Sequence, residues 1–196
     1  MRDNWALGGV LGGAALFFWG MLSHLVLPVG EIGVRTPKPE AEAALVQAMK
    51  EALPERALYL LPGSDPSQPM TEARQKEWVD KMAAGPTALV AFNPGPGTAV
   101  GPGPLATELA SNLATCLIAA WLLTKLAPGT TYFQRVGVVV LLGLVAVLSI
   151  EVSYWNWYSF PTSYLAGQLL DQVVGSALAG IVVARHARPN AQVRST

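Results

Sequence analysis

The sequence predicts an all-α membrane protein: a four-helix transmembrane bundle with a small extracytoplasmic α/β segment between the first and second spans. Two features of the composition carry this prediction. Of the 196 residues, 52% are hydrophobic and 13% are charged, about half the charged share of an ordinary soluble domain. Four segments are also apolar enough to cross a bilayer, which takes about 20 residues per helix. A soluble enzyme and a disordered chain are therefore disfavoured.

The charge and cysteine counts exclude further classes. The 13 basic and 13 acidic residues balance, so the chain lacks the basic excess typical of nucleic-acid binding. The only cysteine is Cys116, which excludes an intrachain disulfide framework and a multi-cysteine metal cluster. The expected surroundings are a lipid bilayer, with no nucleic acid as a partner.

The predicted spans follow the four apolar runs of the sequence. They cover residues 5–29, 105–124, 136–155 and 163–184, and a tail over residues 185–196 follows the last. We interpret the first run as a retained span. It exceeds the apolar core of a signal peptide, and no small-residue cleavage site follows it.

The basic residues in the short flanks predict the orientation of the spans. One precedes the first span, two flank the turn between spans two and three, and three follow the last span: Arg2, Lys125, Arg135, Arg185, Arg188 and Arg194. The loop over residues 153–162 contains neither Lys nor Arg. Because cytoplasmic loops are enriched in Lys and Arg, both termini are expected in the cytoplasm.

The long segment over residues 30–103 is then extracytoplasmic and is expected to be partly folded. Its apolar spacing and its turn residues predict a helix, a strand, a second helix and a second strand. These cover residues 40–53, 57–61, 71–84 and 87–92. The Gly/Pro-rich stretch over residues 93–104 is expected to be a non-helical lead into the second span.

Each predicted span contains one ionisable residue. These are His24, Glu108, Glu151 and Asp171. At a rise of about 1.5 Å per residue, counted from the cytoplasmic ends of the spans, all four fall in the outer third of a hydrocarbon core about 30 Å thick. Charged groups at such depths generally face the interior or water and are functional candidates. Without a Lys or Arg at that level, three converging carboxylates need protons, a metal or a cationic ligand.

Helical spacing indicates which faces these residues occupy. Glu108 shares a face with Ser111 and Asn112, so Asn112 joins the candidate polar site. Asp171 lies between Gly167 and Gly175, in a small-residue stripe that lets another helix approach closely. We therefore expect Asp171 inside the bundle. The alternative for Glu108 and Glu151 is simple hydration near the membrane interface, and for Asp171 it is a purely structural hydrogen bond. For His24 the alternative is a polar anchor near the end of its helix.

Two further patterns suggest contact surfaces. Gly8, Gly9, Gly12 and Gly13 form two overlapping small-residue pairs, a helix-contact face that serves either the bundle or a partner chain. Residues 154–158 form a dense aromatic turn, which is an interfacial belt or an aromatic mouth for an apolar ligand. The candidate residues of that mouth are Trp155, Asn156, Trp157 and Tyr158.

Two landmarks carry a resemblance to a known group of proteins. The run from Ser23 to Pro28 closes the first span, and the run from Tyr154 to Pro161 precedes the fourth. With these landmarks the chain resembles uncharacterised four-span bacterial inner-membrane proteins. The resemblance implies a fold and a location, and it assigns no activity to any residue.

Three functions fit these features. The first is a non-catalytic or accessory subunit of a membrane complex, which docks through its Gly-rich and aromatic faces. The second is a small proton- or cation-coupled transporter that uses the intramembrane acids. The third is a membrane metalloenzyme that holds a divalent metal with His24, Glu108, Glu151 and Asp171. No nucleotide-binding loop and no HExxH motif is present, so an enzyme is the less favoured class.

Overall fold

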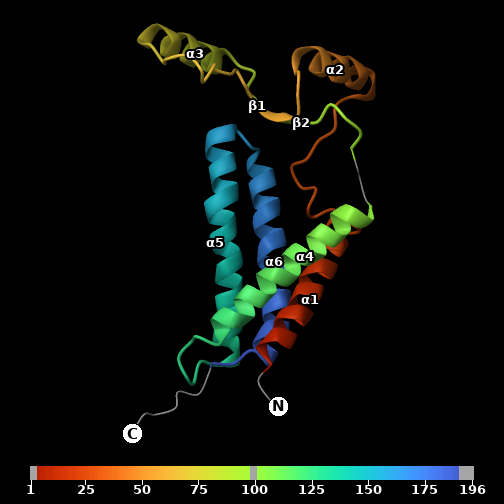
Figure 1. Ribbon diagram of the computed structural model, residues 1–196, viewed down its shortest axis with the longest axis vertical. Coiled ribbons are helices and arrows are strands. Elements are labelled where there is room, and N and C mark those ends of the chain that lie inside the picture. Colours follow the sequence, from red (N-terminus) through yellow and green to blue (C-terminus); the bar gives the residue numbers. More distant parts are fainter. Residues whose placement is uncertain (1–3, 98–100, 190–196) are drawn as a thin grey trace. The chain divides into compact units, whose positions relative to one another are not determined.

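The structure, a computed structural model, describes residues 4–97 and 101–189 and divides the chain into two compact units (Figure 1). The helical unit comprises residues 1–34, 99–153 and 161–196. The α/β unit comprises residues 35–98 and 154–160. Each unit is described by itself.

The described residues contain four helices that are long and apolar enough to cross a membrane. They are α1 (Trp5–Leu25), α4 (Pro102–Leu123), α5 (Tyr132–Tyr158) and α6 (Thr162–His186). These helices agree in number and order with the predicted spans, and they indicate a multi-pass membrane protein. Their ends differ from the predicted ends, for reasons that lie in local backbone chemistry.

Helix α1 ends at Leu25 rather than at residue 29. After this point the chain turns back. The amides of Val29 and Gly30 both donate to the carbonyl oxygen of Ser23, over 2.8 and 3.3 Å. Pro28 has no amide hydrogen to continue the helical ladder. The last predicted turn of the first span is therefore a loop.

Helix α4 begins inside the stretch that was expected to be non-helical. The prediction was wrong for Pro102 to Pro104, which form the first turn of the helix. Amides in a first turn have no intrahelical acceptor, so proline loses nothing there. Residues 98–100 of the same stretch lie outside the described residues.

Helix α5 begins four residues before the predicted span. The amide of Gln134 donates to Thr131 Oγ1 over 3.3 Å, and the amide of Thr131 donates to Gln134 Oε1 over 2.8 Å. This reciprocal capping box fixes the start of the helix. As a result, Arg135 lies within the first turn and is buried, with 8% of its surface exposed.

Polar contacts at one end of the helical unit connect elements that are distant in sequence. The amide of Asn4 donates to the carbonyl of His186 over 3.1 Å. Arg135 donates from Nη1 to Thr130 O over 2.6 Å and from Nη2 to Ala184 O over 3.0 Å. The start of α1, the turn before α5 and the end of α6 therefore meet at one end.

The glycine stripe of α1 packs against the chain's own helices. A Cβ at Gly9 would lie 2.7 Å from Leu117 Cδ2, and one at Gly13 would lie 2.6 Å from Leu113 Cα, both on α4. On the other side Gly8 and Gly12 contact α6, at His186 and Val183. All four glycines are buried, so within this chain the stripe brings α4 and α6 close to α1.

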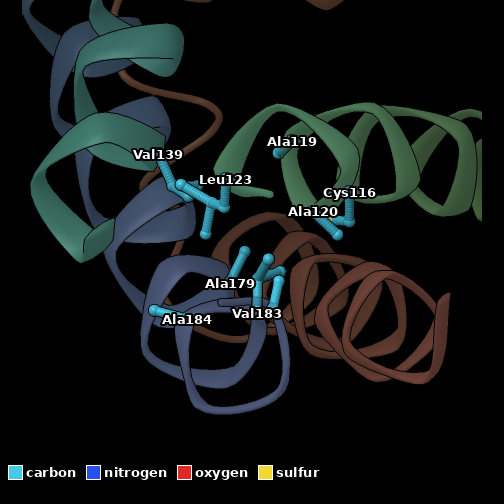
Figure 2. Packing of buried hydrophobic residues seen from close by; sticks show 9 residues of the cluster. Cys116, Ala119, Ala120, Leu123, Val139, Ala179, Val183 and Ala184 are labelled. Carbon is cyan, nitrogen blue, oxygen red and sulfur yellow. The ribbon is translucent and has the colours of Figure 1, made fainter. Parts of the chain in front are cut away.

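The packed core lies near that end of the helical unit. Its side chains are small and come from α4, α5 and α6 (Figure 2): Cys116, Ala119, Ala120, Leu123, Val139, Ala179, Val183 and Ala184. Gly180 fits against Val136 and Val139 of α5, and Tyr132 donates its hydroxyl to Ile181 O over 2.9 Å. Small side chains allow close helix approach where lipid provides no hydrophobic driving force.

The α/β unit has the order of elements that the sequence predicts. Its elements are α2 (Pro39–Ala52), β1 (Ala57–Leu61), α3 (Glu72–Ala84) and β2 (Ala88–Phe92). The two strands pair antiparallel, from Ala57 opposite Phe92 to Leu61 opposite Ala88. Trp78 of α3 donates to Pro62 O over 3.1 Å and ties that helix to the end of β1.

Candidate functional site

A cavity of about 490 Å³ lies between α1, α4 and α6 in the helical unit. We call it the polar cavity. Its polar lining residues are His24, Glu108, Asn112, Thr115, Asp171 and Gln172. The remaining lining residues are apolar or glycine, among them Leu16, Trp19 and Leu105. The cavity therefore combines a few convergent polar groups with apolar walls, which is typical of small-molecule sites.

Three of the four ionisable residues predicted inside the spans line this cavity. His24 comes from the last turn of α1, Glu108 from the early part of α4 and Asp171 from the middle of α6. Among the described residues that line it, none is Lys or Arg. The polar cavity therefore contains two carboxyl groups and, within the described part of the chain, no Lys or Arg side chain to balance their charge.

Glu108 is oriented by its own helix. Asn112 Nδ2 donates to Glu108 Oε1 over 3.1 Å, the contact expected for residues four apart on one helix face. The carboxyl group is exposed rather than buried. Asn112 therefore holds one carboxylate oxygen, and Glu108 keeps acceptor capacity for a ligand.

Asp171 lies on the inner face of α6, as the small-residue stripe predicted. Gly175 packs against Trp19 and Leu16, and Trp19 Nε1 donates to the backbone carbonyl of Asp171 over 3.1 Å. The side-chain oxygen Oδ1 is buried and has no hydrogen-bond partner within the part of the chain that the structure describes. A buried carboxylate oxygen without a partner is costly, which favours a proton or a cation at this point.

His24 connects the cavity to the loop that follows α1. A Cβ on Gly30 would overlap the imidazole ring, so the ring lies directly over this glycine. The Nδ1 atom is 3.8 Å from Glu31 Oε1. His24 therefore lines the cavity and also lies beside the loop that follows α1, and its role as a polar anchor stays a prediction.

Glu151 does not join the other three residues. It lines a smaller cavity of about 110 Å³ between α5 and α6, together with Gln168 and Gln172. Its Oε2 atom is buried and unpaired among the described residues. The separation arises from the packing of α5 on α6, where Gly143 contacts Ser176. Gln168, which lies three residues before Asp171 on α6, also lines this smaller cavity.

The four residues do not form a metal centre. Within residues 4–97 and 101–189, no three His, Cys, Asp or Glu side chains stand close enough to share an ion. The metalloenzyme hypothesis therefore receives no support from the geometry of the described residues.

The aromatic turn lies at the end of α5, in the part assigned to the α/β unit. Tyr154 stacks on Phe160, with ring centroids 5.2 Å apart, and Trp157 is 73% exposed. The candidate mouth residues Trp155, Asn156, Trp157 and Tyr158 line none of the cavities described here. The interfacial belt and the ligand mouth both stay predictions.

A charged hollow on the α/β unit is an alternative site, but its groups already pair with one another. The Ser67 side chain and amide donate to Asp65 and hold the pKa of that carboxyl below its usual value. Lys81 donates to Glu77 over 2.6 Å and lowers the pKa of that carboxyl. Arg74 donates to backbone carbonyls of Asp65 and Pro69. These contacts account for the charges without a ligand.

Several lining residues of the polar cavity have no distinctive sequence signal. Gln172, Thr115 and Trp19 are ordinary residues of apolar helices, and only packing brings them to the cavity. Gln172 follows Asp171, and neighbours on a helix point about 100° apart, so a shared cavity depends on where the other helices lie. The capping box at the start of α5, by contrast, could have been found from its Thr-x-x-Gln spacing.

Comparison with known proteins provides no independent assignment. No family model, no curated protein and no solved structure matches this chain.

Proposed function

We propose that the chain is a small transport protein of the bacterial inner membrane that takes up a cation at the polar cavity and exchanges it for protons. One observation carries the proposal. Glu108 and Asp171, from two different helices, line the same cavity of about 490 Å³, and no Lys or Arg stands among its described lining residues. The proposal keeps two of the three acids that the sequence offered as carriers and leaves Glu151 aside.

The electrostatics of the cavity favour a positive ligand. Ionised carboxylates in a low-dielectric zone repel one another and lose hydration, so they stay charged only beside a cation. When the cation leaves, a proton on one carboxyl group relieves the same cost. The carboxyl group of Asp171, whose Oδ1 lacks a partner among the described residues, is the group at which this exchange is expected.

The two ends of the helical unit suit such a cycle. Near the end where Asn4 meets His186, the glycine stripe and the small-residue core close the space between the helices. The polar cavity lies toward the opposite ends of α1, α4 and α6. This corresponds to a state that is open at one end and closed at the other. With both termini in the cytoplasm, as the basic flanks predict, the open end faces outward.

The test is flux in proteoliposomes that contain the purified protein. Tetramethylammonium is supplied on one side, and its uptake is followed together with the internal pH. The Glu108→Gln and Asp171→Asn double variant is expected to lower uptake at least about tenfold, since each change removes a negative charge that attracts the cation.

The control is Glu151→Gln, which removes an acid that lies on another cavity. It is expected to retain wild-type uptake. Unchanged uptake in the double variant, or no uptake by the wild-type protein above empty liposomes, would overturn the proposal.

A second candidate, an accessory subunit of a membrane complex, is favoured by the surface of the α/β unit. None of the described residues in this unit is buried. On β1, Leu58 and Leu60 are 64% and 38% exposed and lie on the same face of the strand. A two-stranded sheet is marginally stable alone, so a covering partner would explain its apolar surface.

The two candidates predict different responses to mutation. If the chain is an accessory subunit, gently solubilised membranes contain it in a species well above its own 20.7 kDa. That species should be lost in the Leu58→Ser, Leu60→Ser variant and kept in Asp171→Asn. A species whose size in native electrophoresis is the same in all three proteins excludes a partner at this strand face.

A further inference from the structure

A second cavity adjoins the polar cavity in the helical unit. It has a volume of about 250 Å³ and lies among α1, α4, α5 and α6. Leu16, Thr115 and Gln172 line both cavities. The two spaces are therefore neighbours, with lining residues in common from α1, α4 and α6.

The chemistry changes from one cavity to the next. Side chains of the second, which we call the apolar cavity, include Ile118, Leu122, Val139, Leu142 and Ala179. Its polar groups are confined to Thr115, Gln172 and Ser176, none of which carries a charge, and to the thiol of Cys116. Passing from α6 residue 171 to residue 179, the lining changes from a carboxylate to alkyl groups. A ligand that fills both must be charged at one end and apolar at the other.

The sign of the charge follows from the lining of the polar cavity. Two carboxylates face it, and the basic side chains of the spans lie elsewhere: Lys125 follows the end of α4, and Arg135 pairs with carbonyl oxygens at the end of α6. An anionic head would be repelled by Glu108 and Asp171, and the one described lining residue that can gain a positive charge, His24, lies 3.8 Å from the carboxylate of Glu31. The head that fits is cationic.

We propose that the substrate is a cationic amphiphile, with its positive head between Glu108 and Asp171 and its alkyl chain in the apolar cavity. This inference rests on the proposed function and names the substrate class of the same site. The chain direction follows from the helices, because the apolar cavity lies farther from the α6 N-terminus than the polar one. An amphiphile enters the site from the bilayer, with its head already at the depth of the carboxylates.

The alkyl chain contributes to binding in a particular way. A chain that leaves lipid for an apolar cavity gains little hydrophobic free energy, because both surroundings are hydrocarbon. Its benefit is enrichment of the ligand in the membrane and orientation of the head, in the manner of an effective concentration. A tail-less cation should therefore bind the same carboxylates but more weakly.

The experiment is equilibrium binding to the full chain in lipid nanodiscs, with empty nanodiscs subtracted. The probes are dodecyltrimethylammonium, tetramethylammonium as the tail-less head, and dodecanoate as the opposite charge. Dodecyltrimethylammonium is expected to bind at least about tenfold more tightly than tetramethylammonium, and dodecanoate is expected not to bind.

Two sets of variants separate the head from the tail. The Glu108→Gln, Asp171→Asn variant should weaken the binding of both cations about tenfold or more, because it removes the two negative charges that attract the head. Leu142→Trp, which places a large ring in the wall of the apolar cavity, should weaken only dodecyltrimethylammonium. Leu142 is 39% exposed and Leu141, which does not line the cavity, is 59% exposed. Leu141→Trp is thus the matched control and should bind like the wild type.

The outcomes distinguish an amphiphilic substrate from the proposed cation transport itself. If both cations bind equally and Leu142→Trp changes neither, the cation site stands and the amphiphile inference is wrong. If dodecanoate binds as well as dodecyltrimethylammonium, the charge assignment fails. If no cation binds above empty nanodiscs, the proposed function falls together with the inference.

Discussion

At the scale of single residues, the helical unit satisfies most of its buried polar groups and leaves a few unpaired. Ser23 is fully buried, but its hydroxyl donates to Gly20 O over 3.3 Å. Arg135 donates to two backbone carbonyls at the ends of two elements. Asp171 Oδ1 and Glu151 Oε2 have no such partner within the described ranges. Unpaired buried acceptors are rare, and at Asp171 the polar cavity provides room for a partner.

Arg135 provides a direct test of packing at this scale. Its planar guanidinium reaches the carbonyls of Thr130 and Ala184 together, which a single ammonium group cannot reproduce. Arg135→Lys is expected to lower the free energy of unfolding by about 1.5–3 kcal/mol. The measurement is equilibrium unfolding in mixed detergent micelles. Arg185→Lys, at an exposed position of α6, is the control, and equal losses in the two variants would show that the bridge contributes nothing.

At the scale of the elements, glycine sets how closely α1 approaches its neighbours. Gly9 and Gly13 face α4, and Gly8 and Gly12 face α6. Gly20 lies farther along the same helix, and a Cβ built there meets no heavy atom of the described chain within 4 Å. One helix therefore contains both a required glycine and a replaceable one, and the polar cavity begins where the required ones end.

A pair of alanine substitutions tests this difference. In Gly13→Ala the new Cβ would lie 2.6 Å from Leu113 Cα, a backbone atom that cannot move alone, so a loss of about 1–3 kcal/mol is expected. Gly20→Ala is expected to be neutral or to stabilise the helix by up to about 1 kcal/mol. Thermal unfolding in one detergent measures both. Similar melting temperatures for the two variants would mean that the α1–α4 contact is not this close.

At the scale of the whole molecule, local signals and packing determined different parts of the structure. The spans, both strands and the helices of the α/β unit follow from apolar runs, N-caps and turn residues, which act locally. The predicted start of the second span was wrong. Proline breaks the interior of a helix, but Pro102 and Pro104 lie in the first turn of α4, where proline is tolerated.

The polar cavity was predictable only in part. Counting residues from the cytoplasmic ends of the spans predicts similar depths for His24, Glu108 and Asp171, and all three line one cavity. The same count included Glu151, which the rotation of α5 directs to another cavity. Depth follows from helical rise, whereas the direction of a side chain depends on how neighbouring helices pack. The roles of Gln172 and Trp19 likewise arise from packing alone.

The central claim is that Glu108 and Asp171 act on one cation. A double-mutant cycle of tetramethylammonium affinity in nanodiscs tests it most directly, with Glu108→Gln and Asp171→Asn made singly and together. Groups that share a ligand are expected to deviate from additivity by more than about 0.5 kcal/mol. The parallel cycle of Glu108→Gln with Glu151→Gln should be additive. Additive losses in the first cycle, or equal coupling in both, would contradict the account.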